Sequence, residues 1–540
     1  KKNSTSDNYL PADHTTFATA TDSDSYFRKG KYTYGTGEDI NIDANVTLSY
    51  SKIFHEKHQL YAGFDYSIAQ KKNHFYTFIV EGFPDGKLDF IGNALQYEKN
   101  GVPKGTEELS RRVGFTGNVN YIYNNRYFMD LSFRVDGSSL FGTKNKFAPF
   151  WSAGIGWNVH NEKFMQNQNI VNNLRIRGSY GETGSQQFSS YQALSTFQSY
   201  TGKRYIIWNG SELMGLGNEK LKWQVTKQLN GGVEVGLFDG RLSASFDIYS
   251  KKTSNLLSQM DLPLANGFSS YVDNVGEVKN TGYEAMISGY LMRDTHRNII
   301  WSMTAKLAYT KNEITKLSEA IKRQNELYKS KDVEINQLLY EGYAQNSIWA
   351  VPSMGIDPST GYEIFLDKNG NITDKWNPSD KRYFGVDEPK YRGNISTYFA
   401  WKDLAVNLSF AYQWGGQQYN ETLLNKVEVT NGEIDKNNVD SRVLKKRWQH
   451  IGDVKPYKGY GSVETKATSR FVMDDNVFQF QSASVEYRLH SDFLRDKWKV
   501  ETISIGANMS DIFYISSIKR ERGTSYPFAR RLALTLSLMF

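Results

Sequence analysis

The sequence contains no cysteine and no long apolar run. Zero cysteine in 540 residues excludes disulfide bridges, thiolate zinc sites and cysteine nucleophiles. A bundle of membrane-spanning helices needs apolar runs of about 18 residues or more, and none occurs. An excess of one charge is also missing, because 65 Lys and Arg face 58 Asp and Glu, and the basic residues are scattered. This pattern does not favour nucleic-acid binding.

Aromatic residues, in contrast, are abundant. Tyr, Phe and Trp number 35, 31 and 11 and make up 14% of a chain that is only 39% hydrophobic. Disordered chains are poor in aromatics, so this composition excludes intrinsic disorder over most of the length. It favours one large β-structure over several soluble domains of ordinary size.

Apolar and polar residues alternate along many short segments. In 404–414 one face is apolar, aliphatic at the start and aromatic at the end with Phe410, Tyr412 and Trp414. Aromatic rings prefer the boundary between water and hydrocarbon, so this order is typical of a strand that faces lipid. About fifteen segments show the pattern, each near the 9–11 residues that a tilted strand needs to cross a bilayer. They are 40–50, 59–69, 111–123, 127–137, 147–159, 174–181, 225–238, 241–249, 281–292, 299–311, 391–401, 404–414, 477–489, 500–512 and 531–540.

The segments predict an all-β fold, a transmembrane antiparallel β-barrel. Phe540 would end a strand that pairs with the first strand, because a closed barrel leaves no free edge. A soluble propeller or β-helix also has alternating strands, but the sequence lacks the fixed repeat of 20–50 residues that those folds show.

The connections fall into two lengths. Asn124-Asn125 and Asp239-Gly240 predict tight hairpin turns with positive φ. Four polar stretches are much longer, and we expect them to be extracellular loops that carry the function. They are approximately 82–109, 186–220, 316–388 and 415–470.

Metal and catalytic motifs are weak. In His55-Glu56-Lys57-His58 the two His are three residues apart, not four as in a zinc protease, so we interpret the segment as a solvated turn. The oxygen-rich stretch from Asp357 to Asn371 lacks the final Glu of an EF-hand and predicts a hairpin turn. No paired carboxylates of a carbohydrate-active enzyme are recognisable. We therefore expect no enzyme activity, no cofactor and no metal site.

An ordered set of motifs covers the chain from about residue 111 onwards. The motifs are R-V-D-G-S-S-L-F-G at 134–142, L-R-I-R-G-S-Y-G-E-T-G-S-Q at 174–186, L-K-W-Q at 221–224, N-V-G-E-V-K-N-T-G at 274–282, N-M-S-D at 508–511 and the closing Phe. This set resembles the SusC/RagA family of TonB-dependent outer-membrane transporters of Bacteroidetes-type bacteria. It departs from the family pattern with Gly178 for Ala, Ser185 for Asn and Gln224 for Glu.

The motif residues themselves are mostly turn formers and small residues. We interpret them as residues that set turns and strand register. They are Arg134, Asp136, Gly137, Ser138, Gly181, Trp223, Asn274, Gly276, Gly282, Asn508 and Phe540.

The resemblance implies a place in the cell outer membrane, in contact with membrane lipid and lipopolysaccharide. It implies a barrel of about 22 strands around a plug, of which this chain would be the C-terminal portion without the plug. The activity implied is active import of a nutrient such as an oligosaccharide or oligopeptide, with a SusD-like surface lipoprotein as partner. Energy would come from the TonB–ExbB–ExbD complex through the missing N-terminal region. The alternative is a SusC-like barrel acting as a structural or secretion-associated component of a larger outer-membrane complex.

The long loops are rich in aromatic residues. Exposed rings stack on sugars and on peptide side chains, and they dominate many protein interfaces. The alternative is that the rings pack loop against loop. The candidate contacts with substrate or partner are Tyr191, Tyr205, Trp208, Tyr343, Trp349, Tyr362, Trp376 and Tyr383.

Overall fold

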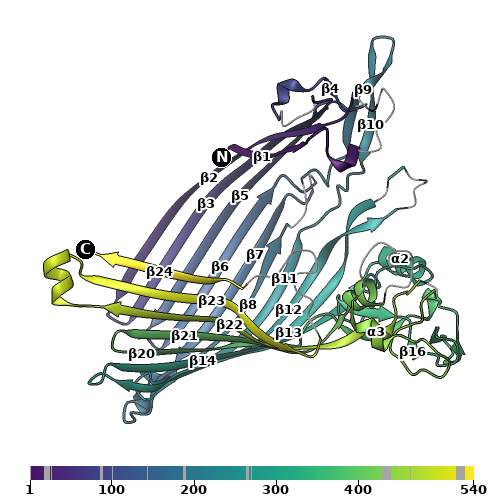
Figure 1. Cartoon of the computed structure of the whole chain (residues 1–540). Helices are drawn as coiled ribbons and strands as arrows, with labels where there is room; N and C mark the ends of the chain where they lie inside the picture. The colour runs from purple at the N-terminus through teal and green to yellow at the C-terminus, as the bar shows by residue number, and fades with distance from the viewer. Residues whose placement is uncertain are drawn as a thin grey trace.

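One curved antiparallel sheet dominates the computed structural model (Figure 1). The structure describes residues 2–17, 25, 27–84, 89–99, 101–142, 144–186, 190–262, 265, 267–268, 270–428, 440–461, 464–518 and 530–540. Within them the sheet has 17 strands. The strands are β1 (Lys2–Leu10), β2 (Lys31–Phe54), β3 (His58–Glu81), β4 (Gln96–Tyr97), β5 (Lys104–Tyr123), β6 (Tyr127–Ser138), β7 (Phe147–Asn158), β8 (Val171–Ser185), β11 (Gln224–Leu237), β12 (Leu242–Asp261), β13 (Ser270–Asp294), β14 (Ile299–Leu317), β20 (Tyr391–Trp401), β21 (Leu404–Tyr419), β22 (Val472–Leu489), β23 (Thr502–Ser516) and β24 (Leu532–Met539).

The strands follow one another around the sheet in chain order. Each long strand pairs antiparallel with the next long strand, and β4 adds a short pair to the end of β3. Hairpin connections allow this arrangement, whereas parallel pairing would need crossovers. Each of the fifteen segments predicted from the alternation coincides with a strand of this sheet and extends past it by two residues at most. The antiparallel β-architecture is therefore confirmed.

In the strand register, apolar residues lie opposite apolar ones on one side of the sheet, and polar or small residues lie opposite each other on the other side. Phe246 of β12 lies opposite Val233 and Ala285, whereas Asp247 lies opposite Gly232 and Glu284. Because side chains alternate along a strand, this register makes one side of the sheet apolar and the other polar. We call these sides the apolar face and the polar face.

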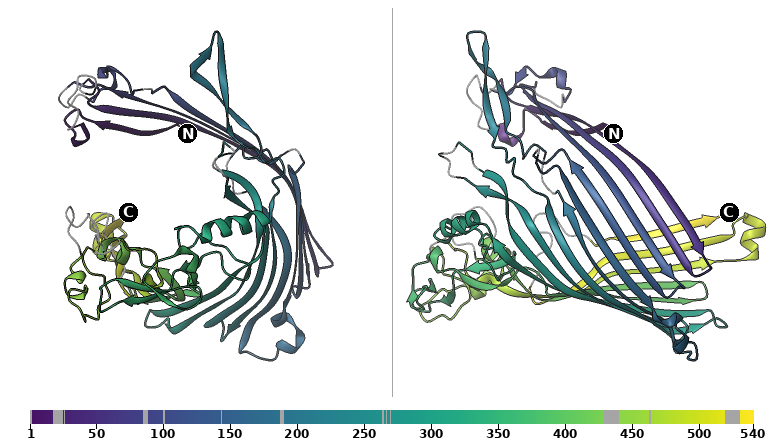
Figure 2. Two further views of the ribbon diagram at one scale, coloured as in Figure 1. Left: turned by 90° about the vertical axis from the view of Figure 1, so that its right-hand side faces the viewer. Right: turned by 180° about the vertical axis from the view of Figure 1, so that it is seen from behind.

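The polar face lines the concave side of the sheet. The helix α2 (Glu319–Lys329) lies inside the curve of the sheet (Figure 2). Its Ile321 packs against Val278 and Ile314. Val278 is on the same side of β13 as Glu284, six residues further along, so α2 marks the concave side as the polar one. The convex, apolar face is the one suited to lipid.

The tight turns are confirmed. Asn124 and Asn125 have φ of 50° and 55°, and Asp239 and Gly240 have φ of 55° and 74°. The predicted turn at His55 also joins two strands, because β2 ends at Phe54 and β3 begins at His58. Positive φ at both central residues matches the twist of the flanking strands.

The predicted pairing of the last strand with the first is wrong for this chain. In the described part, β24 pairs with β23 and β1 pairs with β2, and the two outer edges do not meet. Figure 2 shows an incomplete ring with a wide opening between the first and last strands. Strand number, tilt and shear together fix the size at which a sheet closes. The strands of this chain form an arc rather than a full circle.

The four long loops contain more regular structure than their polarity predicted. Strand β5 begins inside the first loop, and β21 runs on into the last. The loops also hold three small sheets. Their strands are β9 (Thr196–Tyr205), β10 (Trp208–Gly215), β15 (Ser347–Ala350), β16 (Ser353–Ile356), β17 (Glu363–Leu366), β18 (Ile372–Thr373) and β19 (Arg382–Val386).

Helices are few and short. None of those in the described residues is long and apolar enough to cross a membrane. Besides α2 they are α3 (Arg442–Lys446), the single turns η1 (Thr15–Phe17), η2 (Ile91–Asn93), η3 (Val159–Asn161), η4 (Lys163–Met165), η6 (Pro378–Asp380) and η8 (Ser469–Phe471), and the π-turns η7 (Leu423–Val427) and η9 (Leu494–Trp498).

We predict that a charge is tolerated on the polar face and not on the apolar face. Leu408 points from β21 to the apolar side, between Thr397 and Ala483. Leu408→Arg should reduce folding stability in lipid vesicles by about 2–4 kcal/mol, the cost of a cation near the bilayer centre. The matched control, Asn407→Arg, puts the same side chain on the opposite face and should cost less than about 1 kcal/mol. Equal losses in denaturant titrations would contradict the assignment of the faces.

Candidate functional site

Two long connections fold together at one end of the sheet. They are the β14–β20 and β21–β22 connections, and we call their described residues 318–390, 420–428, 440–461 and 464–471 the loop cluster (Figure 1). Trp376 Nε1 donates to the carbonyl oxygen of Ala467 at 3.1 Å, and Trp448 Nε1 donates to that of Pro358 at 3.0 Å. Both bonds join one connection to the other. The loop cluster is therefore a single packed unit.

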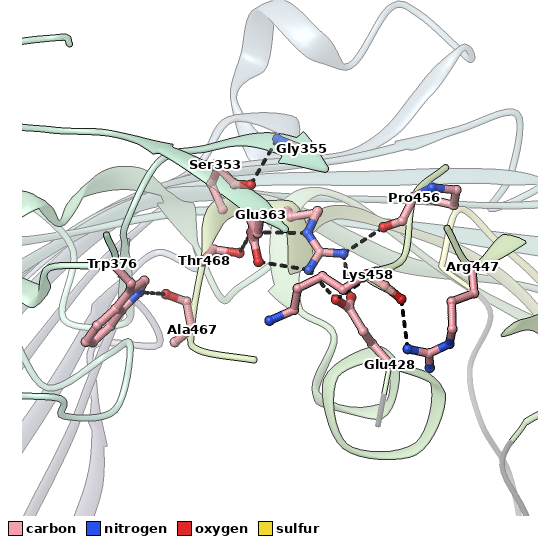
Figure 3. Close-up of polar contacts among 12 residues, drawn as sticks. Ser353, Gly355, Glu363, Trp376, Glu428, Arg447, Pro456, Lys458, Ala467 and Thr468 are labelled. Carbon is pink, nitrogen blue, oxygen red and sulfur yellow. Dashed lines mark hydrogen bonds and ion pairs between the residues drawn. The ribbon is translucent and has the colours of Figure 1, made fainter. Parts of the chain in front are cut away.

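Arg470 lies at the centre of the loop cluster. Its guanidinium binds Glu363 at 3.1 and 3.0 Å and Glu428 at 2.8 and 2.5 Å. Thr468 Oγ1 adds a hydrogen bond to Glu363 at 2.8 Å. The two carboxylates come from β17 and from the residue after η7, so one cation joins both connections (Figure 3). Paired donors aimed at paired oxygens make this the strongest type of ion-pair geometry.

The central charges are buried. The side chains of Arg470, Glu363 and Glu428 are 14%, 2% and 0% exposed. Burial acts to lower the pKa of Arg470, but its hydrogen bonds with Glu428 and Glu363 outweigh this effect and raise the pKa above the ordinary value. Burial also lowers the pKa of the neighbouring Lys458. Removing one partner of such a group leaves an unpaired buried charge, which is far more costly than losing an exposed pair.

Three of the predicted aromatic residues gather in one place. Tyr343, Trp349 and Tyr383 have ring centroids 5.0–5.8 Å apart, and Tyr340 lies 4.6 Å from Trp349. We call these four rings the aromatic cluster. Tyr343 and Tyr383 are 39% and 43% exposed, so the cluster presents part of its surface to the outside. The four rings pack separate parts of the loop against each other, and the exposed rings of Tyr343 and Tyr383 are accessible for stacking.

The other predicted aromatic residues are dispersed. Tyr362 is exposed, and the ring nitrogen of Trp376 donates the hydrogen bond to Ala467 O described above. Tyr191 accepts a hydrogen bond from the backbone of Leu109 at 3.0 Å. Trp208 is 70% exposed at the start of β10, and the side chain of Tyr205 lies outside the described residues. The structure does not bring these rings into a single site.

A polar hollow of about 600 Å³ lies against the sheet near the ends of β6 and β8. It is lined by seven residues of the sequence motifs, namely Arg134, Asp136, Gly137, Gly184, Ser185, Gln186 and Trp223. Arg134 Nε donates to Asp136 at 2.7 Å, and its Nη1 donates to Thr116 at 3.1 Å. The structure thus brings together residues from three motifs that are spread over 134–223 in the sequence.

Cross-strand ion pairs continue along the polar face. Arg177 Nη2 lies 2.7 Å from Asp247 and 3.6 Å from Glu234, on three adjacent strands. These pairs are partly exposed, so their contribution to stability is small. They make the concave side charged and wettable.

The remaining motif residues lie at strand ends and within strands. Ser138 ends β6, as expected of a turn former, and its Oγ accepts a hydrogen bond from Leu140 N at 3.3 Å. Asn274 accepts a hydrogen bond from Lys222 N and donates to Asn255 O, which ties three segments together. Phe540 follows β24 and is largely exposed.

The turn interpretation is wrong for two of the motifs. Gly282 lies within β13 and Asn508 lies within β23, each paired on both sides. At Gly181, Gly276 and Gly282 a Cβ would collide with the neighbouring strand. These glycines therefore allow close approach of backbones in the sheet rather than a change of direction.

The segments that superficially resembled metal sites act as turns. Asp357 accepts hydrogen bonds from Ser359 and Thr360, and Asp367 accepts them from Asn369 and Asn371. These bonds hold the pKa of both carboxyls below the ordinary value. Within the described residues, no group of three or more His, Asp or Glu could hold a metal ion. The hairpin interpretation of this stretch is confirmed.

Sequence analysis did not identify the ion pairs of Arg470 with Glu363 and Glu428. Arg470 is separated by 107 residues from Glu363 and by 42 from Glu428. No local pattern links positions so far apart.

Comparison with known proteins gives consistent matches over almost the whole chain. The family model described as "TonB dependent receptor-like, beta-barrel" matches residues 2–508. TonB-dependent receptor P3 of Formosa agariphila is 28% identical over 537 residues, which is 93% of this chain and 50% of that protein. TonB-dependent receptor SusC of Bacteroides thetaiotaomicron is 24% identical over 434 residues, 76% of this chain and 42% of SusC.

Solved structures share the fold. The RagAB peptide transporter matches with a TM-score of 0.81 and 24% identity, over 91% of this chain and 53% of that chain. The chain thus spans about half the length of the curated relatives that it matches. The resemblance inferred from the motifs is confirmed.

We predict that Arg470 holds the loop cluster together. Arg470→Met should leave Glu363 and Glu428 buried without a counter-charge and destabilise the loop cluster by about 3–5 kcal/mol. Hydrogen–deuterium exchange should then rise in residues 353–366 and 442–461, while the sheet keeps its protection.

The matched control is Arg488→Met, which removes an exposed pair with Glu486 and should change exchange little. Adding Glu363→Gln and Glu428→Gln to Arg470→Met should restore part of the protection. Unchanged exchange in Arg470→Met would show that the ion pairs do not hold the cluster.

Proposed function

Because this chain belongs to the TonB-dependent receptor-like β-barrel family of outer-membrane proteins, we propose that it forms part of the wall of a nutrient importer. Members of this family are receptors and transporters rather than enzymes. The cargo that we propose is an oligosaccharide or an oligopeptide. Import would be active and would draw on the TonB complex through parts of the whole protein that lie outside this chain.

The polar concave face supports the proposal most directly. The apolar face suits lipid, whereas the concave face carries the ion pairs of Arg177 and Arg134 and the 600 Å³ hollow. A sheet with one apolar and one polar face can border a water-filled passage through a bilayer. A purely structural scaffold does not need a charged inner face.

We further propose that the long loops face the cell exterior. In bacterial outer-membrane barrels the short turns are periplasmic and the long loops extracellular. Because each strand runs antiparallel to the next, the tight turns at Asn124 and Asp239 lie at the end of the sheet opposite the loop cluster. The stretches 82–109, 186–220, 316–388 and 415–470 would then meet cargo and partner first.

The partner that we propose is a SusD-like surface lipoprotein. SusC itself is among the relatives, and the solved relative RagAB is described as a peptide transporter. The loop cluster would offer a firm docking surface, because buried ion pairs fix its shape. The exposed rings of the aromatic cluster would contact cargo or partner.

We predict that the aromatic cluster contributes to uptake. In the native host, the full-length protein should carry Tyr343→Ala and Tyr383→Ala together. Each lost ring contact costs about 0.5–1.5 kcal/mol, so the half-saturation concentration for cargo should rise about 2–10-fold per ring. The matched control, Phe493→Ala, removes an exposed ring near η9 at the opposite end of the sheet. Uptake of labelled oligosaccharides and oligopeptides is measured with and without TonB.

Detergent extraction of the same strains tests the partner. A SusD-type lipoprotein should co-purify with the full-length protein. Uptake that persists without this protein, together with a different co-purifying assembly, would contradict import and favour the structural or secretion-associated role. Equal uptake by the Tyr variant and the Phe493 control would limit the aromatic cluster to packing.

A further inference from the structure

A hollow of about 660 Å³ lies on the apolar face, where β2, β3, β5, β6 and β7 run side by side. We call it the face hollow. All its lining residues belong to the described part of the chain. Those whose side chains point to the apolar face are Leu48, Tyr50, Ala62, Phe64, Gly117, Val119, Leu131, Phe133 and Trp151. The others are their neighbours along the strands, whose side chains point to the polar face.

The face hollow exists because Gly117 has no side chain. The strand register places Gly117 of β5 between Phe64 of β3 and Phe133 of β6. Leu48 and Trp151 lie one strand further out on either side. A Cβ at Gly117 would meet no heavy atom within 4 Å, so the space above it is open. In this row of large apolar residues, only the central side chain is missing.

Gly117 lies midway across the apolar band of β5. Arg111, six residues before it and on the same side of the strand, donates a hydrogen bond to Gln70 at 2.9 Å and begins the polar border. Tyr123, six residues after it, stacks on Tyr127 with ring centroids 6.5 Å apart. Such rings mark the boundary of a bilayer. Twelve residues tilted by about 40° cover about 30 Å, the thickness of the hydrocarbon core. The face hollow therefore opens at the centre of the bilayer.

The width of the face hollow suits a hydrocarbon chain and excludes a helix. Phe64 and Phe133 stand on the two strands that flank β5, whose backbones are about 10 Å apart. The gap between the two rings is thus narrower than the diameter of about 10–12 Å of an α-helix with its side chains. An acyl chain is a single file of methylene groups and fits between the rings.

A second small residue lengthens the face hollow. Ala62 of β3 lies opposite Val119, two positions nearer the tight turns than Gly117. Tyr50 of β2 lies opposite Ala62 on the other side. The two small residues, Gly117 and Ala62, leave a diagonal path across neighbouring strands. An elongated path bordered by rings and aliphatic side chains matches the shape of an acyl chain.

We propose that the face hollow binds one acyl chain of a membrane lipid as a ligand. The protein belongs to an outer-membrane barrel family, and this face is the one against lipid, so acyl chains are the groups that reach the hollow. Contact with rings on both sides gains dispersion energy that a flat surface does not offer. Water does not compete, because an apolar hollow gives it no hydrogen-bond partners. Binding requires only the lipid-facing wall and does not depend on what the protein imports.

The first test measures lipid binding to the full-length protein in detergent micelles, after its own lipids have been washed away. The probe is a phosphatidylcholine with bromine on its acyl chains, which quenches tryptophan fluorescence on contact. The part of the quenching that is absent in Trp151→Phe reports on the face hollow. In the wild type this part should saturate at one lipid per protein. Quenching that rises without saturation would show lipid that only passes over the surface, and would overturn the proposal.

The second test fills the face hollow with Gly117→Leu. The new side chain meets open space on an extended strand, so the variant should fold as well as the wild type. Its affinity for the brominated lipid, read from Trp151, should fall at least 10-fold.

The matched control is Gly231→Leu, at another glycine of the apolar face. A Cβ there meets only Ile248, at 3.7 Å, and the position lies outside the face hollow. Its affinity for the lipid should stay within 2-fold of the wild type. Equal affinity of Gly117→Leu and the wild type would overturn the proposal.

A side chain from a second copy of the protein is the alternative occupant. Sedimentation of the wild type and of Gly117→Leu in the same micelles separates the two cases. If lipid occupies the face hollow, both proteins should sediment alike. An oligomer that dissociates in Gly117→Leu, together with no saturable lipid binding by the wild type, would assign the hollow to a protein contact and overturn the proposal.

Discussion

Backbone hydrogen bonding in lipid is the constraint on which the rest of the structure depends. A strand in hydrocarbon finds no water, so each N–H and C=O must bond to a neighbouring strand. The long strands meet this requirement by pairing with their neighbours in chain order, over as many as 24 residues in β2 and β3. Side chains are then free to divide between lipid and water. The polar face with Arg177 and Asp247 is a consequence of that division.

Close backbone contact is the second requirement, and it explains the strand glycines. At Gly282 a Cβ would collide with Tyr309 O and with the ring of Tyr249 on the neighbouring strands. Gly393 has the same relation to Lys306 O and Tyr412, and Tyr412 donates a hydrogen bond to Lys306 O at 2.6 Å. A tyrosine ring that lies over a glycine fills the missing side-chain volume and fixes the register, since a slip of one residue would move the ring to the other face.

The sequence was sufficient to predict the strands of the sheet, but not the small strands and ion pairs within the loops. Alternation located the long strands because one face must be apolar, and Asn124-Asn125 revealed a turn because few residues accept positive φ. The polar β1, and short strands such as β16 and β18, offer too few alternating apolar residues to be recognised. Gly282 suggested a turn because small and polar residues are also turn formers, and only the pairing on both sides of β13 decides otherwise.

The shape of the loop cluster depends on its buried ion pairs. Arg470 pairs with both Glu363 and Glu428, the two carboxylates buried beside it, and these bonds hold the loop cluster in one shape. A surface of fixed shape suits one constant protein partner, because little conformational freedom is lost on binding.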